Sequence, residues 1–172
     1  MNTNAKQNLE RMIGSDAVAE LDQWVAKYPE DRKRSAVMAG LMIAQRQNGG
    51  HLTTELMDAV ADYLEIPHIA AYEVATFYSM YNLEPVGRHV INVCTNISCM
   101  LRGSDDLIAH IEKRLGIKPG ETTSDGQFTL RAVECQGACV GAPMLEVDHE
   151  FHEHMTPEKL DALIDKLAQP AQ

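Results

Sequence analysis

Apolar residues recur at helical spacing through the first half of the chain. Leu56, Val60 and Leu64, for example, lie four positions apart, which is the spacing of one face of an amphipathic helix. The pattern predicts four helices, over residues 17–28, 35–47, 53–64 and 67–78. Residues 1–16 are polar and weakly patterned, so we expect them to form a flexible N-terminus.

The pattern changes after residue 85, where shorter stretches replace the long amphipathic ones. Residues 128–133 alternate apolar and polar positions, as a half-buried strand does. Other strands are expected over 89–93, 144–147 and 151–154, and helices over 103–115 and after Thr156, a suitable N-cap. This order predicts a small mixed sheet packed against helices, and it is compatible with a thioredoxin-like sheet. We therefore divide the chain into a helical domain, 17–84, and an α/β domain, 85–172.

Composition and charge exclude several classes of protein. The chain has 172 residues, of which 45% are hydrophobic, enough to bury a core. Its formal net charge is −10, a poor match for a phosphate backbone, so we expect no nucleic-acid partner. No run of about 18 apolar residues occurs, so we expect no insertion into a membrane. The N-terminus has the pattern of neither a secretory signal nor a transit peptide, which favours a cytoplasmic protein of bacterial type.

The four cysteines fall into two pairs, Cys94-x4-Cys99 and Cys135-x3-Cys139. Each pair begins where a predicted strand ends, and strand ends at one edge of a sheet lie close together. Four thiolates fit a [2Fe–2S] cluster, and they also fit a structural zinc ion. Neither pair has the C-x-x-C spacing of a redox dithiol. Their position at two strand ends makes four unrelated core thiols a poor explanation.

Several stretches carry a resemblance to one family. The second cysteine pair has the form C-x-G-x-C, with Gly137 at its centre, and the residues after it are Ala142, Pro143 and Met144. The other matching stretches are 73–79, 85–90, 116–123 and 155–158. Over about residues 17–168, the chain resembles the E-type (24-kDa-type) [2Fe–2S] subunit of NADH–quinone oxidoreductase, respiratory complex I. Thr95 departs from the pattern, since an acidic residue often follows the first cysteine, but the departure removes no ligand.

The resemblance implies an α+β chain, with an N-terminal helical bundle followed by a thioredoxin-like α/β domain that carries one [2Fe–2S] cluster. The implied cluster ligands are Cys94, Cys99, Cys135 and Cys139. The implied role is electron transfer, in which the cluster accepts single electrons from the flavin of a partner flavoprotein subunit that binds FMN and NADH. The chain would be part of an enzyme but not catalytic alone. It would lie in a respiratory complex, peripheral to the inner membrane. The chain has no G-x-G-x-x-G after a strand, which agrees with NADH binding by the partner.

Alternative functions stay open on the sequence alone. An NAD-linked formate dehydrogenase or hydrogenase could use an equivalent [2Fe–2S] subunit. A zinc-stabilised structural interaction module would also use four thiolates. A free-standing thioredoxin-like ferredoxin is less suitable, because a free carrier would not need the long helical N-terminal part.

Two other groups of side chains have competing explanations. Phe77, Tyr78 and Tyr81 lie near the domain junction, where they could form a docking surface for the flavoprotein or a core between the domains. The second group is His149 with the neighbouring histidines 152 and 154. Acidic residues surround these histidines, which favours a solvated edge over a metal site.

Overall fold

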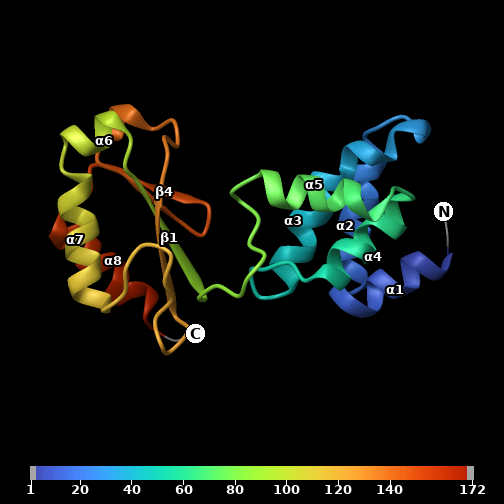
Figure 1. The fold of residues 1–172 in the computed structure, drawn as a ribbon, viewed down its shortest axis with the longest axis horizontal. Coiled ribbons are helices and arrows are strands. Elements are labelled where there is room, and N and C mark those ends of the chain that lie inside the picture. Colours follow the sequence, from blue (N-terminus) through green and yellow to red (C-terminus); the bar gives the residue numbers. More distant parts are fainter. Residues whose placement is uncertain (1–2, 170–172) are drawn as a thin grey trace. The chain divides into compact units, whose positions relative to one another are not determined.

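Amphipathic helices build the first of the two units into which the chain divides, Met1–Pro85 and Val86–Gln172. The computed structural model describes residues 3–169. The helices of the first unit (Figure 1) are α1 Thr3–Ile13, α2 Ser15–Val25, the 3-10 helix η1 Glu30–Ala36, α3 Val37–Gln47, α4 Thr54–Leu64 and α5 His68–Phe77.

Helix α4 shows how local sequence sets these boundaries. The Thr53 side chain accepts a hydrogen bond from the Leu56 N–H (3.3 Å) and caps the N-terminus. Glu65 ends the helix in the left-handed conformation, with φ 56°. The apolar stripe of the helix is buried, with Val60 fully inaccessible. The helix expected over residues 53–64 is therefore confirmed.

The expectation of a flexible N-terminus over residues 1–16 is wrong for the part that the structure describes. Residues 3–13 form α1, which contacts α2 and α4. Ala5, Leu9 and Ile13 lie four positions apart and are buried. Only three apolar side chains make this stripe, and polar residues surround them, so the periodicity was too weak to predict the helix.

The region before α3 also differs from expectation. We expected one helix over 35–47, but the 3-10 helix η1 occupies residues 30–36 and α3 begins at Val37. Arg32 has φ −121° and ψ 24° inside η1, which kinks that segment. Short 3-10 segments have no apolar stripe of their own, so periodicity does not reveal them.

The aromatic residues near the domain junction divide into two environments within the first unit. Tyr81 is buried in the helical core, and its hydroxyl donates to the Met38 carbonyl (3.0 Å). Phe77 is 78% exposed and Tyr78 is 40% exposed. Tyr81 is therefore a packing residue of the helical unit, whereas Phe77 lies on that unit's surface.

The second unit contains a four-stranded mixed sheet in the order β2-β1-β3-β4. The strand β1 pairs with β2 in parallel and with β3 antiparallel, and β3 pairs with β4 antiparallel. The elements of this unit are β1 His89–Cys94, α6 Ile97–Leu101, α7 Ser104–Leu115, β2 Phe128–Val133, η2 Cys139–Gly141, β3 Leu145–Val147, β4 Glu150–His152 and α8 Pro157–Leu167.

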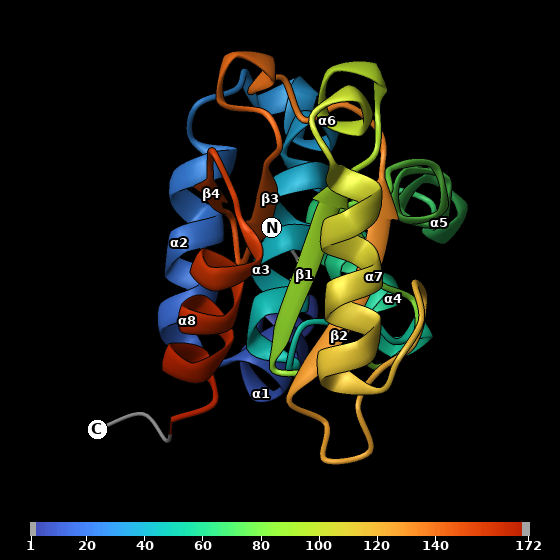
Figure 2. The ribbon, with the colours of Figure 1, turned by 90° about the vertical axis from the view of Figure 1, so that its left-hand side faces the viewer.

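Helices α7 and α8 lie over the same face of this sheet (Figure 2). Ile91 and Val93 of β1 point to that face and pack in one cluster with Leu107 of α7 and Leu160 of α8. Successive strand residues point to opposite faces, so Asn92 lies on the other side. Mixed α/β structure with N-terminal helices confirms the expected fold class. Among residues 3–169, no helix is long and apolar enough to cross a membrane.

Replacing Leu9 by alanine tests whether α1 belongs to the helical core. Leu9 is fully buried, so Leu9→Ala should lower the free energy of unfolding by about 2–5 kcal/mol. Urea unfolding of the full chain measures this loss. Met12→Ala is the matched control, because Met12 lies on the same helix and is 39% exposed. Equal effects of the two substitutions would show that α1 does not pack as described.

Candidate metal centre

The two cysteine pairs lie at the same edge of the sheet, because β1 and β2 run in parallel and end side by side. Cys94 is the last residue of β1 and stands opposite Val133, the last residue of β2. Cys99 follows in α6, and Cys135 and Cys139 follow β2 in the next loop. The structure thus brings all four cysteines to one end of the second unit.

Hydrogen bonds tie the first cysteine loop to the second. Thr95 donates twice to the Val133 carbonyl, from its N–H (2.9 Å) and from its hydroxyl (3.1 Å). The Asn96 amide donates to the Glu134 carboxylate (2.8 Å). The Asn96 side chain also accepts from the Ile97 N–H (2.8 Å) and so caps α6. Each loop therefore holds the other in place beside the strand ends.

The two pairs differ in their exposure to solvent. Cys94 is 3% exposed and Cys99 is 1% exposed, whereas Cys135 and Cys139 are both exposed. All four are free thiols. The side of the site with Cys94 and Cys99 is therefore buried in the second unit, and the side with Cys135 and Cys139 is exposed to solvent.

The outer pair has the spacing of two ligands on one metal. The sulfurs of Cys135 and Cys139 are 3.5 Å apart. Two thiolates that share a tetrahedral metal with bonds of about 2.3 Å have sulfurs about 3.8 Å apart. The Gly137 N–H also donates to the Cys135 sulfur (3.4 Å), and such a donor stabilises a thiolate. The residues present therefore fit thiolate-bound metal.

Electrostatic interactions connect the two pairs. Burial raises the pKa of the Cys99 thiol, and the nearby Cys94 and Cys139 thiols raise it further. The hydrogen bond and the charge of Cys135 raise the pKa of the Cys139 thiol, and Cys94 adds to this effect. The sulfurs of the two pairs are therefore close enough for one thiolate to oppose the ionisation of the next. A bound cation favours thiolates, so metal binding at this site would release protons.

The thiols contact each other within each pair, Cys94 with Cys99 and Cys135 with Cys139. Within the described range 3–169, no group of three or more histidine, cysteine, aspartate or glutamate side chains is placed to hold one metal ion. A cluster of two irons uses two pairs of cysteines.

His149, which we expected on a solvated edge, has a side chain that is 74% exposed. Its Nδ1 atom lies 3.3 Å from Glu146 Oε1.

Comparison with known families agrees with this arrangement. A family model for the thioredoxin-like [2Fe–2S] ferredoxin matches residues 21–168, a span that contains both cysteine pairs. The chain belongs to this family. The match covers most of the chain, and it confirms the thioredoxin-like fold that the order of strands and helices allowed.

Two curated relatives of this ferredoxin-family chain come from NADH-quinone oxidoreductases. The chain is 51% identical over 143 residues to the E-type NADH-quinone oxidoreductase subunit of Rickettsia bellii (strain RML369-C), and the match covers 83% of this chain and 86% of that protein. It is 45% identical over 146 residues to the E-type subunit numbered 2 of the NADH-quinone oxidoreductase of Rhizobium meliloti (strain 1021), covering 85% of each. The family expected from the motifs is therefore confirmed.

A solved structure shares the fold at lower identity. The crystal structure of an NAD+-reducing [NiFe]-hydrogenase in the air-oxidized state superposes with a TM-score of 0.64. The match has 23% sequence identity and covers 74% of this chain but 22% of the hydrogenase chain. At this identity the likeness shows a common fold.

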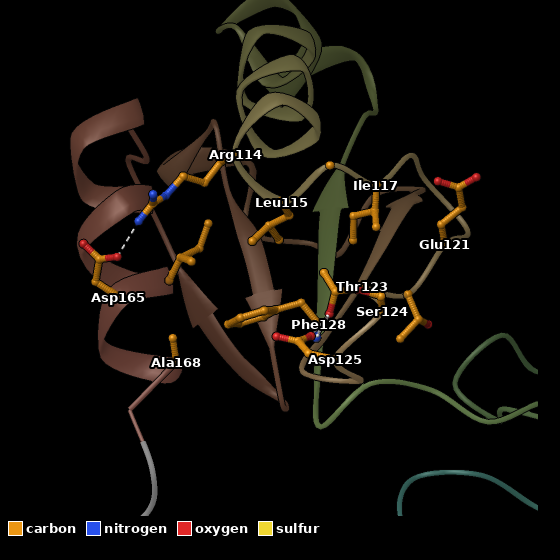
Figure 3. Close-up of a pocket in the computed structure, with 13 residues that line it drawn as sticks. Arg114, Leu115, Ile117, Glu121, Thr123, Ser124, Asp125, Phe128, Asp165 and Ala168 are labelled. Atoms are coloured by element: carbon orange, nitrogen blue, oxygen red, sulfur yellow. Dashed lines mark hydrogen bonds and ion pairs between the residues drawn. The ribbon is translucent and has the colours of Figure 1, made fainter.

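One hollow of this ferredoxin-family chain lies away from the cysteines, where β2 begins (Figure 3). Its volume is about 820 Å³, and Phe128 forms part of its lining. Polar side chains at its rim form hydrogen bonds with one another. Arg114 donates to Asp165 (2.5 Å), and the Thr123 hydroxyl donates to Asp125 (2.5 Å). No cysteine lines the hollow, which lies at the opposite end of the strands from the cysteines.

Sequence reasoning missed the short helix α6 and the residues that lock the loops. The helix expected over residues 103–115 is confirmed as α7, but the shorter helix α6 before it, which begins at Ile97 and contains Cys99, was not expected. Its five residues are too few to show a helical stripe. Asn96 immediately before it was the available sign, because asparagine is a favoured N-cap.

Gly141 gives a steric test of the second cysteine loop in this ferredoxin-family chain. A Cβ at this position would lie 2.4 Å from Glu153 Cδ and 2.6 Å from Glu153 Cβ. Gly141→Ala should therefore displace the loop, destabilise the unit by about 1–3 kcal/mol, and lower the iron retained per chain. Thermal unfolding and iron analysis measure both effects. Adding Glu153→Gly removes the clash and should restore iron binding, and full iron in the single variant would contradict this packing.

Proposed function

We propose that this chain is the electron-transfer subunit of an NADH-quinone oxidoreductase and that Cys94, Cys99, Cys135 and Cys139 hold its one [2Fe–2S] cluster. The observation that carries the proposal is the pairing of four free thiols at one sheet edge, with two buried and two exposed. The chain shares 51% sequence identity with E-type subunits of NADH-quinone oxidoreductases, which supports an NADH-quinone oxidoreductase as the parent complex.

The difference in exposure between the two cysteine pairs suggests the side from which electrons would enter the cluster. Cys94 and Cys99 are buried and would bind the inner iron, whereas Cys135 and Cys139 are exposed and would bind the outer iron. The polypeptide insulates the inner side, so an electron donor reaches the cluster from the Cys135–Cys139 side. The cluster supplies the redox chemistry, and the chain supplies its position and its surroundings.

Exposed apolar side chains flank the open side of the site and support a protein partner there. Ile97 and Leu101 of α6 are 64% and 76% exposed, and Val140 of η2 is 93% exposed. Apolar residues grouped at a polar, ionisable site are typical of a surface that a partner covers. We assign this surface, Ile97, Leu101 and Val140, to the flavoprotein subunit that binds FMN and NADH.

The complex would lie at the cytoplasmic face of the inner membrane.

A second candidate is the equivalent subunit of an NAD-linked hydrogenase or formate dehydrogenase. The shared fold with the NAD+-reducing hydrogenase favours it, but the higher identity over most of the chain favours NADH-quinone oxidoreductase. The subunits that co-purify with the chain decide between the two. The zinc-stabilised interaction module would contain zinc in place of iron and sulfide, and chemical analysis of the metal distinguishes it directly.

Iron and acid-labile sulfide analysis of anaerobically purified full-length chain tests the cluster. We expect about two irons and two sulfides per chain, with an EPR signal after dithionite reduction. Alanine substitution of any of the four cysteines should remove most of the iron. Ser98→Ala is the control, because Ser98 contacts the Cys139 thiol but is not proposed as a ligand. Zinc without sulfide in the unsubstituted chain would refute the electron-transfer function.

Charged substitutions test the docking surface. Leu101→Asp and Val140→Asp add a charge to the apolar surface beside the cysteines, so each should weaken binding to the flavoprotein subunit about tenfold or more. Pull-down and titration with that subunit measure the loss, while the iron content should stay unchanged. Ala109→Asp on the exposed face of α7 is the matched control. Binding that is unaffected by either substitution would place the flavoprotein elsewhere.

A further inference from the structure

Glu146, in the middle of β3, accepts hydrogen bonds from three residues. Its Oε2 atom accepts from the side-chain amides of Gln136 (2.9 Å) and Asn92 (3.3 Å). Its Oε1 atom accepts from the His149 N–H (3.1 Å) and lies 3.3 Å from His149 Nδ1. The Glu146 side chain is only 16% exposed. A carboxylate buried to this degree is retained only when hydrogen bonds compensate for its lost hydration.

The donors to Glu146 come from the two segments that carry the cysteines. Asn92 lies on β1, two residues before Cys94, and Gln136 directly follows Cys135. One carboxylate therefore connects the strand that ends in the inner pair with the loop that holds the outer pair. Asn92 and Glu146 are opposite each other in the antiparallel β1–β3 register, so the sheet itself fixes the position of the carboxylate.

The carboxylate of Glu146 sets the orientation of the Gln136 side-chain amide. A carboxylate accepts but does not donate, so the Gln136 amide must turn its nitrogen towards Glu146. This leaves the Gln136 Oε1 atom buried, with no hydrogen-bond partner in the described part of the chain. A buried polar atom without a partner is unfavourable. The bond to Glu146 thus connects the Gln136 side chain, and with it the second cysteine loop, to the sheet.

We propose that Glu146 is a positioning residue for the cluster, which ties the Cys135–Cys139 loop to the sheet and keeps a negative charge beside it. The proposal rests on the proposed function, because it assumes that the four cysteines hold the cluster. Reduction adds negative charge to the bound iron, and a nearby carboxylate opposes that addition. Glu146 therefore both steadies the outer ligands and lowers the reduction potential of the site.

Glu146→Gln separates the charge from the tether. A glutamine at this position keeps the size of the side chain, and its amide can still bond to a turned Gln136 amide. The full-length variant should therefore retain its iron but show a more positive midpoint potential in a dithionite titration followed by EPR. Asp161→Asn is the matched control, because it removes an equal charge from α8, where Asp161 bonds to His110 rather than to a cysteine loop. A midpoint equal to that of the unsubstituted chain, or a shift matched by the control, would overturn the electrostatic role.

Gln136→Leu removes the tether and leaves the charge. Loss of a residue that supports metal ligands typically costs about 10–100-fold in metal affinity, so cluster loss to a chelator should be about tenfold faster. The decay of visible absorbance under anaerobic conditions measures this rate. Unchanged decay would overturn the positioning role. The unsubstituted chain distinguishes the two proposals: if it binds no iron and sulfide, the proposed function fails, whereas a stable cluster with insensitive variants refutes only the role of Glu146.

Discussion

Strand β1 pairs with β2 in parallel, and this pairing places Cys94 opposite Val133 at one end of the sheet. The side chains of a strand alternate between the two faces, so a shift of one residue would exchange every inward and outward position. Such a shift would expose Ile91 and Val93, which are now buried against α7 and α8. Burial of these side chains therefore fixes the register, and the register brings the two cysteine loops together.

The polar contacts around the cysteines refine a position that the hydrophobic core has already set. Thr95 and Asn96 join the two loops to each other, whereas Gln136 and Glu146 join the second loop to the sheet. The neighbouring Cys135 and Cys94 thiols raise the pKa of the Cys139 thiol, so its thiolate form is disfavoured by their proximity. Metal reverses this preference by favouring thiolates. The loop contacts therefore position four thiols that a bound metal would convert to thiolates.

Sequence patterns predicted the elements with a strong periodicity and missed those with little or none. Residues 128–133 alternate, and they form β2. Helix α1 has only three buried apolar positions among polar residues, and α6 has five residues in all, so neither shows a usable period. The cysteine pairs were visible because two strands end at them. The contact between Gln136 and Glu146 was not, since it joins a loop to a strand that becomes its neighbour only when the sheet forms.

A thioredoxin-like sheet does not itself determine which chemistry takes place at its edge, because one fold can carry unrelated sites. A redox dithiol of this fold needs two cysteines separated by two residues, close enough to form one disulfide. In this chain the separations are four and three residues, and the pairs lie on different loops. The separation of three residues places Gly137 between Cys135 and Cys139, and its N–H donates to the Cys135 sulfur. The spacing of the cysteines therefore differs from that of a thiol-exchange site, and the exposed pair leaves one side of the cysteine site open to solvent.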